Sequence, residues 1–425
     1  MGQAGGARIQ AHENPPLSRG AFGVGTASAE AARCRQWNPF MTPPKDDLRE
    51  IARHFQTGAD FICAERCSSG HIHDTFVGIY RRDGADIRFI HQWINHHVFK
   101  QPELVMENID RVTSHQRRKL LEAGCPDPER RALAIVPALD GRPWHRTAEG
   151  NYWRTFRFID KARTSEAVES AAQAAEVARA FGDFQRHLVD LPAPRLHETI
   201  PAFHHTPTRF AALVQAIESD PLNRACNVRR EIDFALAHEP ITGTLLALNA
   251  AGEIPERITH NDTKLNNVML TDAGEGICVI DLDTVMPGLA LYDFGDMVRT
   301  ATSSSLEDER DLSKVQMQMP MFRALVDGYL SAARDFLTPA ERDHLAFSGK
   351  LITFQIGIRF LTDHLLGDSY FRIHRPGHNL DRARTQFALI ESIEQQEEAM
   401  AAYVAERWAA AGAGERLDRR GNGRH

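Results

Sequence analysis

A single change in secondary-structure pattern near residue 160 constrains the fold of this chain more than any other feature of its sequence. Between Phe55 and Phe158, short runs rich in β-branched and aromatic residues alternate with turn residues, as is typical of β-strands. After Asp160, longer segments carry apolar residues at helical spacing. We therefore predict an α+β fold with a β-rich amino-terminal lobe, residues 43–160, and a mainly helical carboxy-terminal lobe, residues 161–410.

One helix is predicted among the strands of the amino-terminal lobe, because Leu104, Val105, Ile109 and Val112 fall at helical spacing within Pro102–Ala123. Five strands are predicted around it, at residues 61–67, 75–81, 87–94, 133–139 and 152–159. The resulting order of three strands, one helix and two strands is that of the amino-terminal lobe of protein kinases.

The carboxy-terminal lobe contains one short β-rich segment, residues 257–286, among predicted helices. The first helix is expected over Ser165–Leu188, which is rich in alanine and other good helix formers. The two ends of the chain, residues 1–42 and 411–425, are expected to be disordered. Further helices are expected around residues 229–237, 314–333, 339–360 and 382–410.

Composition is that of an ordinary globular protein, with 42% apolar and 25% charged residues. The net charge of −7 argues against broad nucleic-acid binding, which requires a basic face. No apolar run approaches the roughly 20 residues of a membrane-spanning helix, so we expect no membrane partner. The amino terminus lacks the apolar region of a secretory signal, and we expect a cytoplasmic location. Six cysteines in so long a chain do not indicate a disulfide framework.

The β-rich segment carries the residues best suited to chemistry. Asp262 lies in a loop that leads into an apolar strand, and Asn267 follows five residues later. A carboxylate there can accept the proton of an attacking hydroxyl, and an amide oxygen of the same loop can bind magnesium. A second apolar run, Ile277–Ile280, ends in the carboxylates of Asp281 and Asp283, which are hard oxygen ligands. The competing interpretation is a polar hairpin whose Asp and Asn residues only form turns.

These residues belong to a longer resemblance. His260–Leu270, Val279–Gly288 and Leu291–Asp296 resemble the corresponding motifs of aminoglycoside phosphotransferase-type small-molecule kinases, most closely the N-acetylhexosamine 1-kinase branch. The resemblance implies a protein-kinase-like two-lobe fold and Mg²⁺-dependent transfer of phosphate from ATP to the anomeric hydroxyl of an N-acetylated hexose. Shorter motifs that extend it over roughly residues 45–400 are Ser69–Thr75, Gln92–Lys100, Phe203–Thr206, Phe360–Asp363 and Arg375–Ala383.

The resemblance also implies roles for four residues of the β-rich segment, and the position of Asp293 and Asp296 suggests a role for them. Asp262 is expected to be the catalytic base, and Asn267 and Asp281 are expected to hold magnesium. Asp283 is expected to be a further ligand or to support the ligands from behind. Asp293 and Asp296 follow a turn and are expected to brace the catalytic loop from a buried position.

The nucleotide and the acceptor are expected to bind on either side of these residues. Ser69 and Gly70 lie in a turn of small residues, where backbone N–H groups can approach phosphate oxygens. Phe158 and Ile159, at the junction of the lobes, are candidates to border the adenine, although both could equally be core residues. The residues that the resemblance implies as sugar contacts are His71, Arg359 and Tyr370.

Two positions depart from the expected pattern. Gln92 stands on the third strand where a protein kinase carries its phosphate-pairing lysine, so the group that anchors the phosphates is left open. His73 stands where the relatives usually have Asn, which puts a role in sugar choice at that position in doubt. The nearest basic residues by sequence are Arg66, Lys100 and Lys264.

Other acceptors and other classes of protein compete with the sugar-kinase prediction. A choline-type pocket would need an aromatic cage, and an aminoglycoside pocket would be strongly acidic. The segment after Arg359 mixes basic residues with acidic ones, which suits a neutral sugar better. An ion pair between Arg359 and Asp363, one helical turn apart, is the alternative to a sugar-binding role. A homoserine-type kinase and a catalytically silent kinase-like binding module complete the alternatives.

Overall fold

The structure, a computed structural model, describes residues 46–67, 72–165 and 167–421, with side chains up to residue 410. Among the described helices, none combines the length and the apolar character that crossing a membrane requires.

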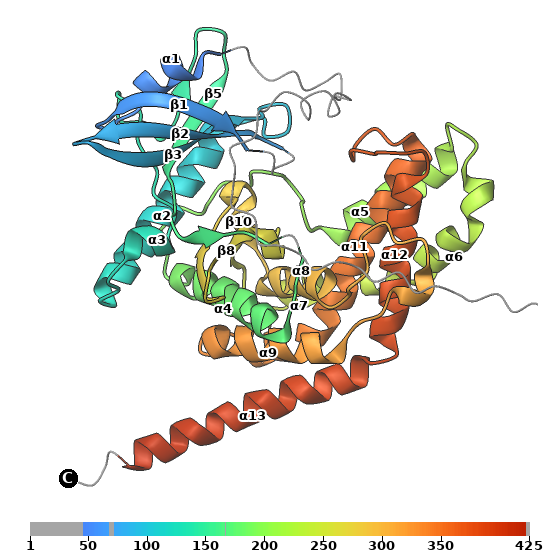
Figure 1. The fold of residues 1–425 in the computed structure, drawn as a ribbon. Coiled ribbons are helices and arrows are strands. Elements are labelled where there is room, and N and C mark those ends of the chain that lie inside the picture. The colour runs from blue at the N-terminus through green and yellow to red at the C-terminus, as the bar shows by residue number, and fades with distance from the viewer. Residues whose placement is uncertain (1–45, 68–71, 166, 422–425) are drawn as a thin grey trace, which may run out of the picture. The chain divides into compact units, whose positions relative to one another are not determined.

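A five-stranded antiparallel sheet forms the amino-terminal lobe (Figure 1). Its elements are α1 (Leu48–Arg53), β1 (Asp60–Arg66), β2 (Asp74–Arg82), β3 (Ala85–Ile94), α2 (Pro102–Glu122), α3 (Pro128–Arg131), β4 (His145–Arg146) and β5 (Tyr152–Arg157). The strands lie in the order β1-β2-β3-β5-β4. The first three are consecutive, and β5 pairs with the other edge of β3 although the two are almost 60 residues apart in the chain. Ile51 of α1 packs with buried aromatic residues of the sheet, among them Tyr80, Phe89 and Trp153.

Four of the five predicted strands are present, each within two residues of its predicted bounds. The predicted strand at residues 133–139 is wrong. That segment makes two isolated bridges, Ile135 with Phe156 and Phe55 with Ala138. Pro137 has no N–H to donate, so a regular ladder cannot continue through it.

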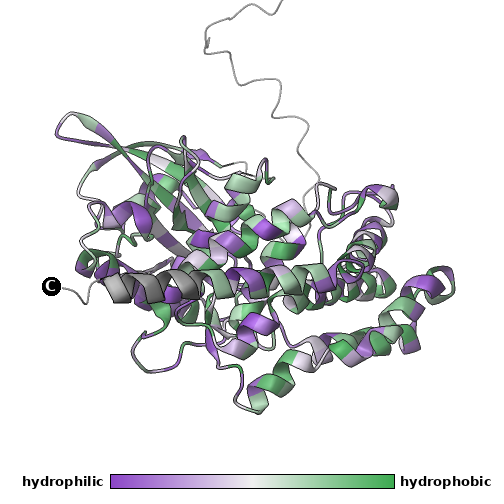
Figure 2. Ribbon diagram, turned by 90° about the horizontal axis from the view of Figure 1, so that it is seen from below, coloured by the Kyte–Doolittle hydropathy of each residue, from purple (hydrophilic) through white to green (hydrophobic). Residues whose placement is uncertain are grey.

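The carboxy-terminal lobe is mainly helical, as predicted. Its central helix, α11 (Leu345–Leu366), is buried over most of its length, and neighbouring helices surround it. Along most other helices, hydrophobic and hydrophilic residues alternate, as expected where one face is buried (Figure 2). The remaining helices are α4 (Ala171–Leu188), α5 (Thr206–Ser219), η1 (Ala225–Val228), α6 (Arg229–Ala237), η2 (Glu239–Ile241), α7 (Thr244–Ala250), α8 (Ala290–Ala301), η5 (Leu312–Lys314), α9 (Met319–Ala333), α10 (Pro339–Asp343), α12 (His378–Glu394) and α13 (Glu397–Gly421).

Several helix boundaries differ from the prediction. The segment predicted as one helix over 339–360 is α10 followed by α11, and the segment 382–410 is divided between α12 and α13. Helix α4 begins at Ala171, where the Ser170 hydroxyl caps it by accepting from the N–H of Gln173. Helix α13 extends to Gly421, whereas the predicted helix ended at residue 410. Alanine, arginine and glutamate in that stretch are good helix formers.

Helix α8 has no counterpart among the predicted helices. Eleven of its twelve residues are buried, including Asp293, Asp296 and Arg299. Leu291, Phe294, Met297 and Val298 do fall at helical spacing, so the apolar pattern of this helix was present in the sequence and the prediction missed it.

Two small sheets hold the segment predicted to carry the chemistry. Strands β6 (Ala162–Arg163), β8 (Val268–Thr271) and β9 (Gly276–Val279) form one sheet, and β7 (Arg257–Thr259) pairs with β10 (Met286–Gly288) in the other. The loop between β7 and β8 contains η3 (Leu265–Asn267), and the loop between β9 and β10 contains η4 (Leu282–Thr284). The predicted β-rich segment, residues 257–286, is thus confirmed.

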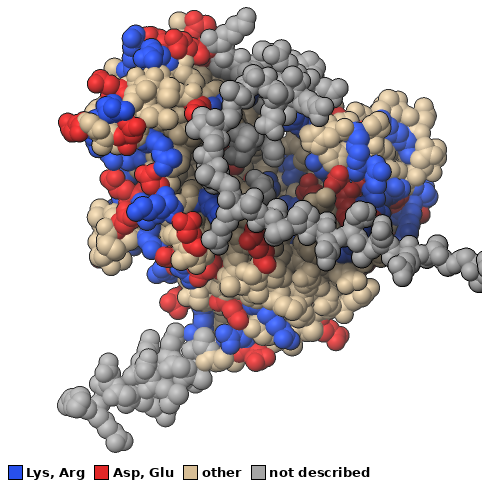
Figure 3. All heavy atoms as spheres, viewed as in Figure 1, with Lys and Arg blue, Asp and Glu red and all other residues tan. Residues whose placement is uncertain are grey.

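The surface carries charges of both signs. On the face shown in Figure 3, acidic and basic side chains are interspersed wherever the described residues are visible.

Candidate active site

Asp293 of α8 holds the loop between β7 and β8 through hydrogen bonds. Asp293 accepts hydrogen bonds from the backbone N–H groups of His260 (2.9 Å) and Asn261 (2.7 Å) and from the side chain of Gln185 (2.7 Å). Thr263 in turn donates its hydroxyl to the carbonyl of Asp293 (2.6 Å). The predicted bracing role of Asp293 is therefore confirmed.

Asp296 was predicted to brace the same loop, and that prediction is wrong. Its carboxylate pairs with Arg299, with 2.8 Å between Oδ1 and Nε, one helical turn further along α8. No hydrogen bond joins Asp296 to the loop between β7 and β8 among the described residues; the N–H groups of His260 and Asn261 bind Asp293 instead.

Asn267 holds Asp262 in place. Its side-chain amide donates to the Asp262 carbonyl (2.8 Å) and to the Asp262 carboxylate (3.3 Å). Both N–H groups of the Asn267 amide therefore point toward Asp262. Among the described residues no hydrogen bond engages the side-chain oxygen of Asn267, and this oxygen is available to a cation.

Asp262 is ionised and partly open to solvent. Its side chain is 26% exposed, and Lys264 Nζ lies 2.9 Å from its Oδ1. Burial alone would raise the pKa of Asp262, but the charges of Lys264, His260 and Arg299 outweigh this effect and lower it. An ionised carboxylate at this position can accept a proton.

Asp281 stands in the neighbouring loop with a left-handed backbone, φ 61° and ψ 56°. The preceding residue, Ile280, donates its N–H to the carbonyl of Asn267 (2.9 Å), which places the two loops side by side. Desolvation, followed by repulsion from Asp283, raises the pKa of Asp281. A divalent cation would relieve both effects, because it favours the ionised carboxylate.

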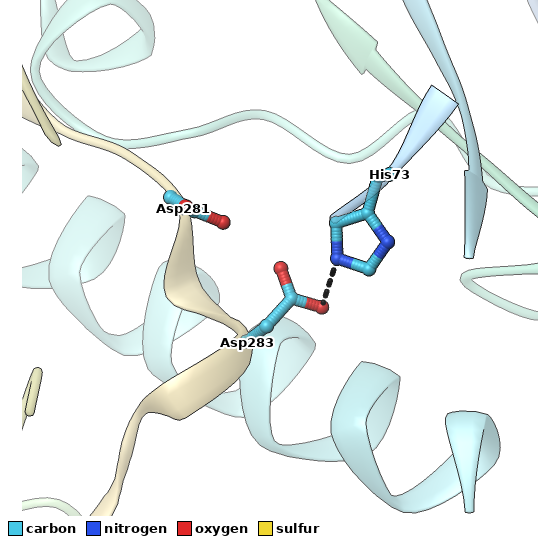
Figure 4. A group of neighbouring side chains, drawn as sticks. All are labelled: His73, Asp281 and Asp283. Carbon is cyan, nitrogen blue, oxygen red and sulfur yellow. Dashed lines mark ion pairs between the residues drawn. The ribbon is translucent and has the colours of Figure 1, made fainter. Parts of the chain in front are cut away.

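His73, Asp281 and Asp283 lie close enough to be considered as a metal-binding group, with one potential ligand atom of each within 4.8 Å of the others (Figure 4). The hydrogen bonds of His73 argue against its being a ligand. Its Nδ1 accepts the backbone N–H of Asn95 (3.1 Å), so in the neutral ring Nε2 carries the hydrogen. That Nε2 lies 3.3 Å from Asp283 Oδ1, and because it carries the hydrogen it has no lone pair to offer a metal.

Both carboxylate oxygens of Asp283 are already engaged. Arg154 Nη1 donates to Oδ1 and Nη2 to Oδ2, each at 2.7 Å, in a bidentate pair that is almost fully buried. Burial alone would raise the pKa of Asp283, but Arg154 and His73 hold it far below its usual range. The groups that remain to hold a divalent cation are the Asp281 carboxylate and the Asn267 side-chain oxygen. Both are hard oxygen donors and fit magnesium, whose other ligands are usually phosphate oxygens and water.

Arg154 is not among the residues that the sequence singles out. It lies in the middle of β5, between Trp153 and Thr155, and only 2% of it is exposed. A charged residue inside a strand of otherwise buried aromatic and β-branched residues is the signal that could have identified it, because such a charge requires a partner.

The nucleotide side is only partly described. Ser69, Gly70 and His71 lie outside the described residues. Ile159 is buried in the main core, whereas Phe158 is half-buried and carries the guanidinium of Arg88 over its ring, 3.9 Å from the centroid. That Phe158 and Ile159 border the adenine stays a prediction.

On the acceptor side, the structure places Arg359 and Tyr370 together. The guanidinium of Arg359 lies 5.4–5.8 Å from the ring centroids of Phe203, Tyr370 and Phe371. Its Nη2 is 3.4 Å from the Tyr370 hydroxyl. Among the described residues Arg359 has no carboxylate partner.

The alternative prediction of an ion pair between Arg359 and Asp363 is wrong. Asp363 is buried and accepts the backbone N–H groups of Ser369, Tyr370 and Phe371 at 2.8–2.9 Å, together with the side chain of Asn379. These four donors occupy its carboxylate, so Arg359 remains available to a ligand.

Comparison with known proteins places this site in a family. Residues 81–332 match the family described as "Phosphotransferase enzyme family" (APH). Among solved structures, the chain is similar to the microcompartment-associated aminopropanol kinase, with 15% identity, 83% of this chain and 98% of that chain covered, and a TM-score of 0.50. It is also similar to an aminoglycoside phosphotransferase from Alicyclobacillus acidocaldarius, with 12% identity, 87% and 98% covered, and a TM-score of 0.49.

The likeness to the aminopropanol kinase shows the fold, and the predicted protein-kinase-like architecture is confirmed. The family match covers more than half of the 425 residues and includes Asp262, Asn267 and Asp281. The chain therefore belongs to the APH family of phosphotransferase enzymes.

Proposed function

We propose that this protein is a magnesium-dependent kinase that transfers the γ-phosphoryl group of ATP to the anomeric hydroxyl of an N-acetylhexosamine. The observation that carries the phosphoryl-transfer part is the arrangement of Asp262, Asn267 and Asp281. A braced, ionised carboxylate stands beside two free oxygen donors suited to a divalent cation. Bound magnesium would neutralise the phosphate oxygens.

In the proposed reaction, Asp262 accepts the proton of the sugar hydroxyl while that oxygen attacks the γ-phosphorus. The bond from the γ-phosphorus to the bridging oxygen of ADP breaks, and ADP leaves with the electron pair. Asn267 orients the receiving carboxylate, and Lys264 favours its ionised form. General-base help of this kind contributes about 10²–10⁴ in rate.

The surroundings of Arg359 support a neutral acceptor. An arginine without a carboxylate partner repels the amines of cationic acceptors but donates hydrogen bonds to hydroxyl and carbonyl oxygens. The rings of Phe203, Tyr370 and Phe371 add an aromatic surface that can face the C–H groups of a sugar. A kinase of a cationic acceptor such as choline, or of homoserine, is the alternative.

The test is ADP release by the purified protein with ATP and magnesium. The acceptors are N-acetylglucosamine, N-acetylgalactosamine, glucose, galactose, choline, homoserine and kanamycin, with NMR of each phosphorylated product. An anomeric phosphate on an N-acetylhexosamine is the expected result. Turnover of choline, homoserine or kanamycin alone would contradict the sugar assignment and keep the kinase mechanism. ATP binding without turnover of any acceptor would favour the silent binding module.

Substitution at Arg359 tests the acceptor pocket separately. Arg359→Met keeps the length of the side chain and removes its donors, so the KM for the sugar should rise at least about tenfold, with little change in the KM for ATP. Arg372→Met, at an exposed position between α11 and α12, is the control and should leave both constants unchanged. An unchanged sugar KM in Arg359→Met would remove Arg359 from the acceptor site.

A further inference from the structure

Gln92, which stands where a protein kinase has its third-strand lysine, is hydrogen-bonded to a buried arginine on the neighbouring strand of the sheet. Gln92 occupies that position on β3, and its side-chain oxygen accepts a hydrogen bond from Arg154 Nε (2.9 Å). The amide of Gln92 donates to the Thr75 hydroxyl on β2 (2.9 Å). Gln92 is thus held by its neighbours in the orientation that presents an acceptor to Arg154.

The guanidinium of Arg154 also binds a residue of the carboxy-terminal lobe. Both Nη atoms bind Asp283 at 2.7 Å, and Asp283 lies two residues after Asp281. The pair therefore joins the strand β5 directly to the loop that presents Asp281. His73, the residue before β2, adds a third contact to Asp283. Three segments that are distant in sequence meet at this one carboxylate.

We propose that Arg154 is a positioning residue for phosphoryl transfer, and that the Arg154–Asp283 pair takes the structural place of the lysine-centred ion pair of protein kinases. Arg154 acts through Asp283, which sets the position of Asp281 relative to the amino-terminal sheet. The inference rests on the phosphoryl-transfer part of the proposed function and is independent of the acceptor.

The charge of the site supports a positioning role. Asp281 and Asp283 lie close together, with a carboxylate oxygen of each within 4.8 Å of the other. Arg154 neutralises Asp283 and directs both of its oxygens toward β5, so that Asp281 alone supplies a carboxylate to the cation. Without Arg154, Asp283 would be free to turn and compete with Asp281 for the metal.

Stability alone does not explain why this ion pair is buried. Desolvation makes a buried ion pair a weak source of stability, and apolar residues of similar volume often replace one without loss. The side chains of Arg154 and Asp283 are 2% and 3% exposed. Bidentate geometry fixes orientation as well as distance, which is what the loop carrying a metal ligand needs.

The test compares ADP binding with magnesium and with EDTA by titration calorimetry, using the full chain. The ratio of the two affinities measures how strongly the metal and the nucleotide are coupled. In Arg154→Gln this ratio should fall by about 10–100-fold, as is typical when a residue that orients a metal ligand is removed, while metal-free ADP binding stays near the wild-type value. The turnover number should fall in parallel, with a smaller change in the KM for ATP.

Four further variants make the test specific. Asp283→Asn should reproduce the loss, and the double variant Arg154→Gln/Asp283→Asn should lose little more, because the two residues act as one unit. Arg154→Lys keeps the charge and should restore part of the coupling. Arg157→Gln is the matched control, since Arg157 lies on the same strand but is exposed and pairs with Glu129.

Each outcome decides a separate point. A folded Arg154→Gln protein with the wild-type affinity ratio would overturn the inference, and so would an Arg154→Lys protein that restores none of the coupling. An equal loss of ADP affinity with and without magnesium would also overturn it, in favour of direct phosphate binding by Arg154. If the wild-type protein bound ADP with no enhancement by magnesium, the proposed function itself would fail, and the two failures are thereby distinguished.

Discussion

Asp262 combines two properties at the scale of one residue: a lowered pKa and contact with both Asn267 and Lys264. Asp262→Asn keeps the shape but cannot accept a proton, so the turnover number should fall by about 10²–10⁴ with ADP affinity unchanged. Steady-state ADP release and calorimetric ADP titration measure the two effects. Asp272→Asn, on the exposed β8–β9 turn, is the control. Near-wild-type turnover in Asp262→Asn would contradict its role as the base.

At the scale of elements, the amino-terminal sheet is held by a buried histidine on β3. His91 Nε2 pairs with the Tyr80 hydroxyl on β2 (2.7 Å), and Nδ1 pairs with the Thr155 hydroxyl on β5 (2.8 Å). Gly78 makes room for the ring, because a Cβ there would lie 2.9 Å from His91 Nε2. Burial lowers the pKa of His91 to about 4. The neutral ring is thus part of the folded sheet.

This histidine should make the protein sensitive to acid. In the unfolded chain the pKa of histidine is about 6.5, so below this pH the unfolded chain binds a proton that folded His91 refuses. The contribution of His91 is fully present above about pH 6.5 and is lost as the pH falls toward 4, by up to about 3 kcal/mol of unfolding free energy. Denaturant unfolding at several pH values measures it. In His91→Gln the pH slope should be smaller, and an identical slope in both proteins would contradict the assignment.

A second prediction at the scale of elements concerns the crossing of α4 and α9. A Cβ on Gly328 would lie 2.0 Å from the carbonyl oxygen of Ala175, so Gly328→Ala must push the two helices apart. We expect a loss of about 1–3 kcal/mol in the free energy of unfolding. Gly243→Ala is the control, because nothing lies within 4 Å of a Cβ there. Helix propensity alone favours alanine by about 1 kcal/mol, so a stabilised Gly328→Ala protein would contradict the packing.

At the scale of the whole molecule, ligand binding should stabilise the fold through groups that come from both lobes. The proposed metal ligands Asn267 and Asp281 lie in the carboxy-terminal lobe, and the predicted phosphate-binding turn lies in the amino-terminal lobe. Magnesium and ADP together should therefore raise the thermal unfolding midpoint by more than ADP with EDTA does. At a ligand concentration of about 100 times Kd, the gain is about 2.7 kcal/mol. Equal shifts with and without magnesium would argue against a metal that bridges nucleotide and protein.

The sequence by itself determined the features that depend on local spacing. The change from strands to helices near residue 160 follows from residue type and periodicity within short windows. The spacing of Asp262, Asn267 and Asp281 is equally local, because two small sheets and short loops hold these residues within 20 positions of one another. Residue patterns in short windows can therefore predict that such near neighbours come close together.

Only the tertiary structure decided the contacts between residues that are far apart in the chain. Arg154 and Asp283 are 129 positions apart, and no periodicity relates an arginine in a strand to a carboxylate in a distant loop. The same holds for Asp293, which accepts a hydrogen bond from Gln185, 108 positions away, as well as from the backbone of His260 and Asn261. A buried charge must find a partner, but which partner it finds is set by how the elements pack together.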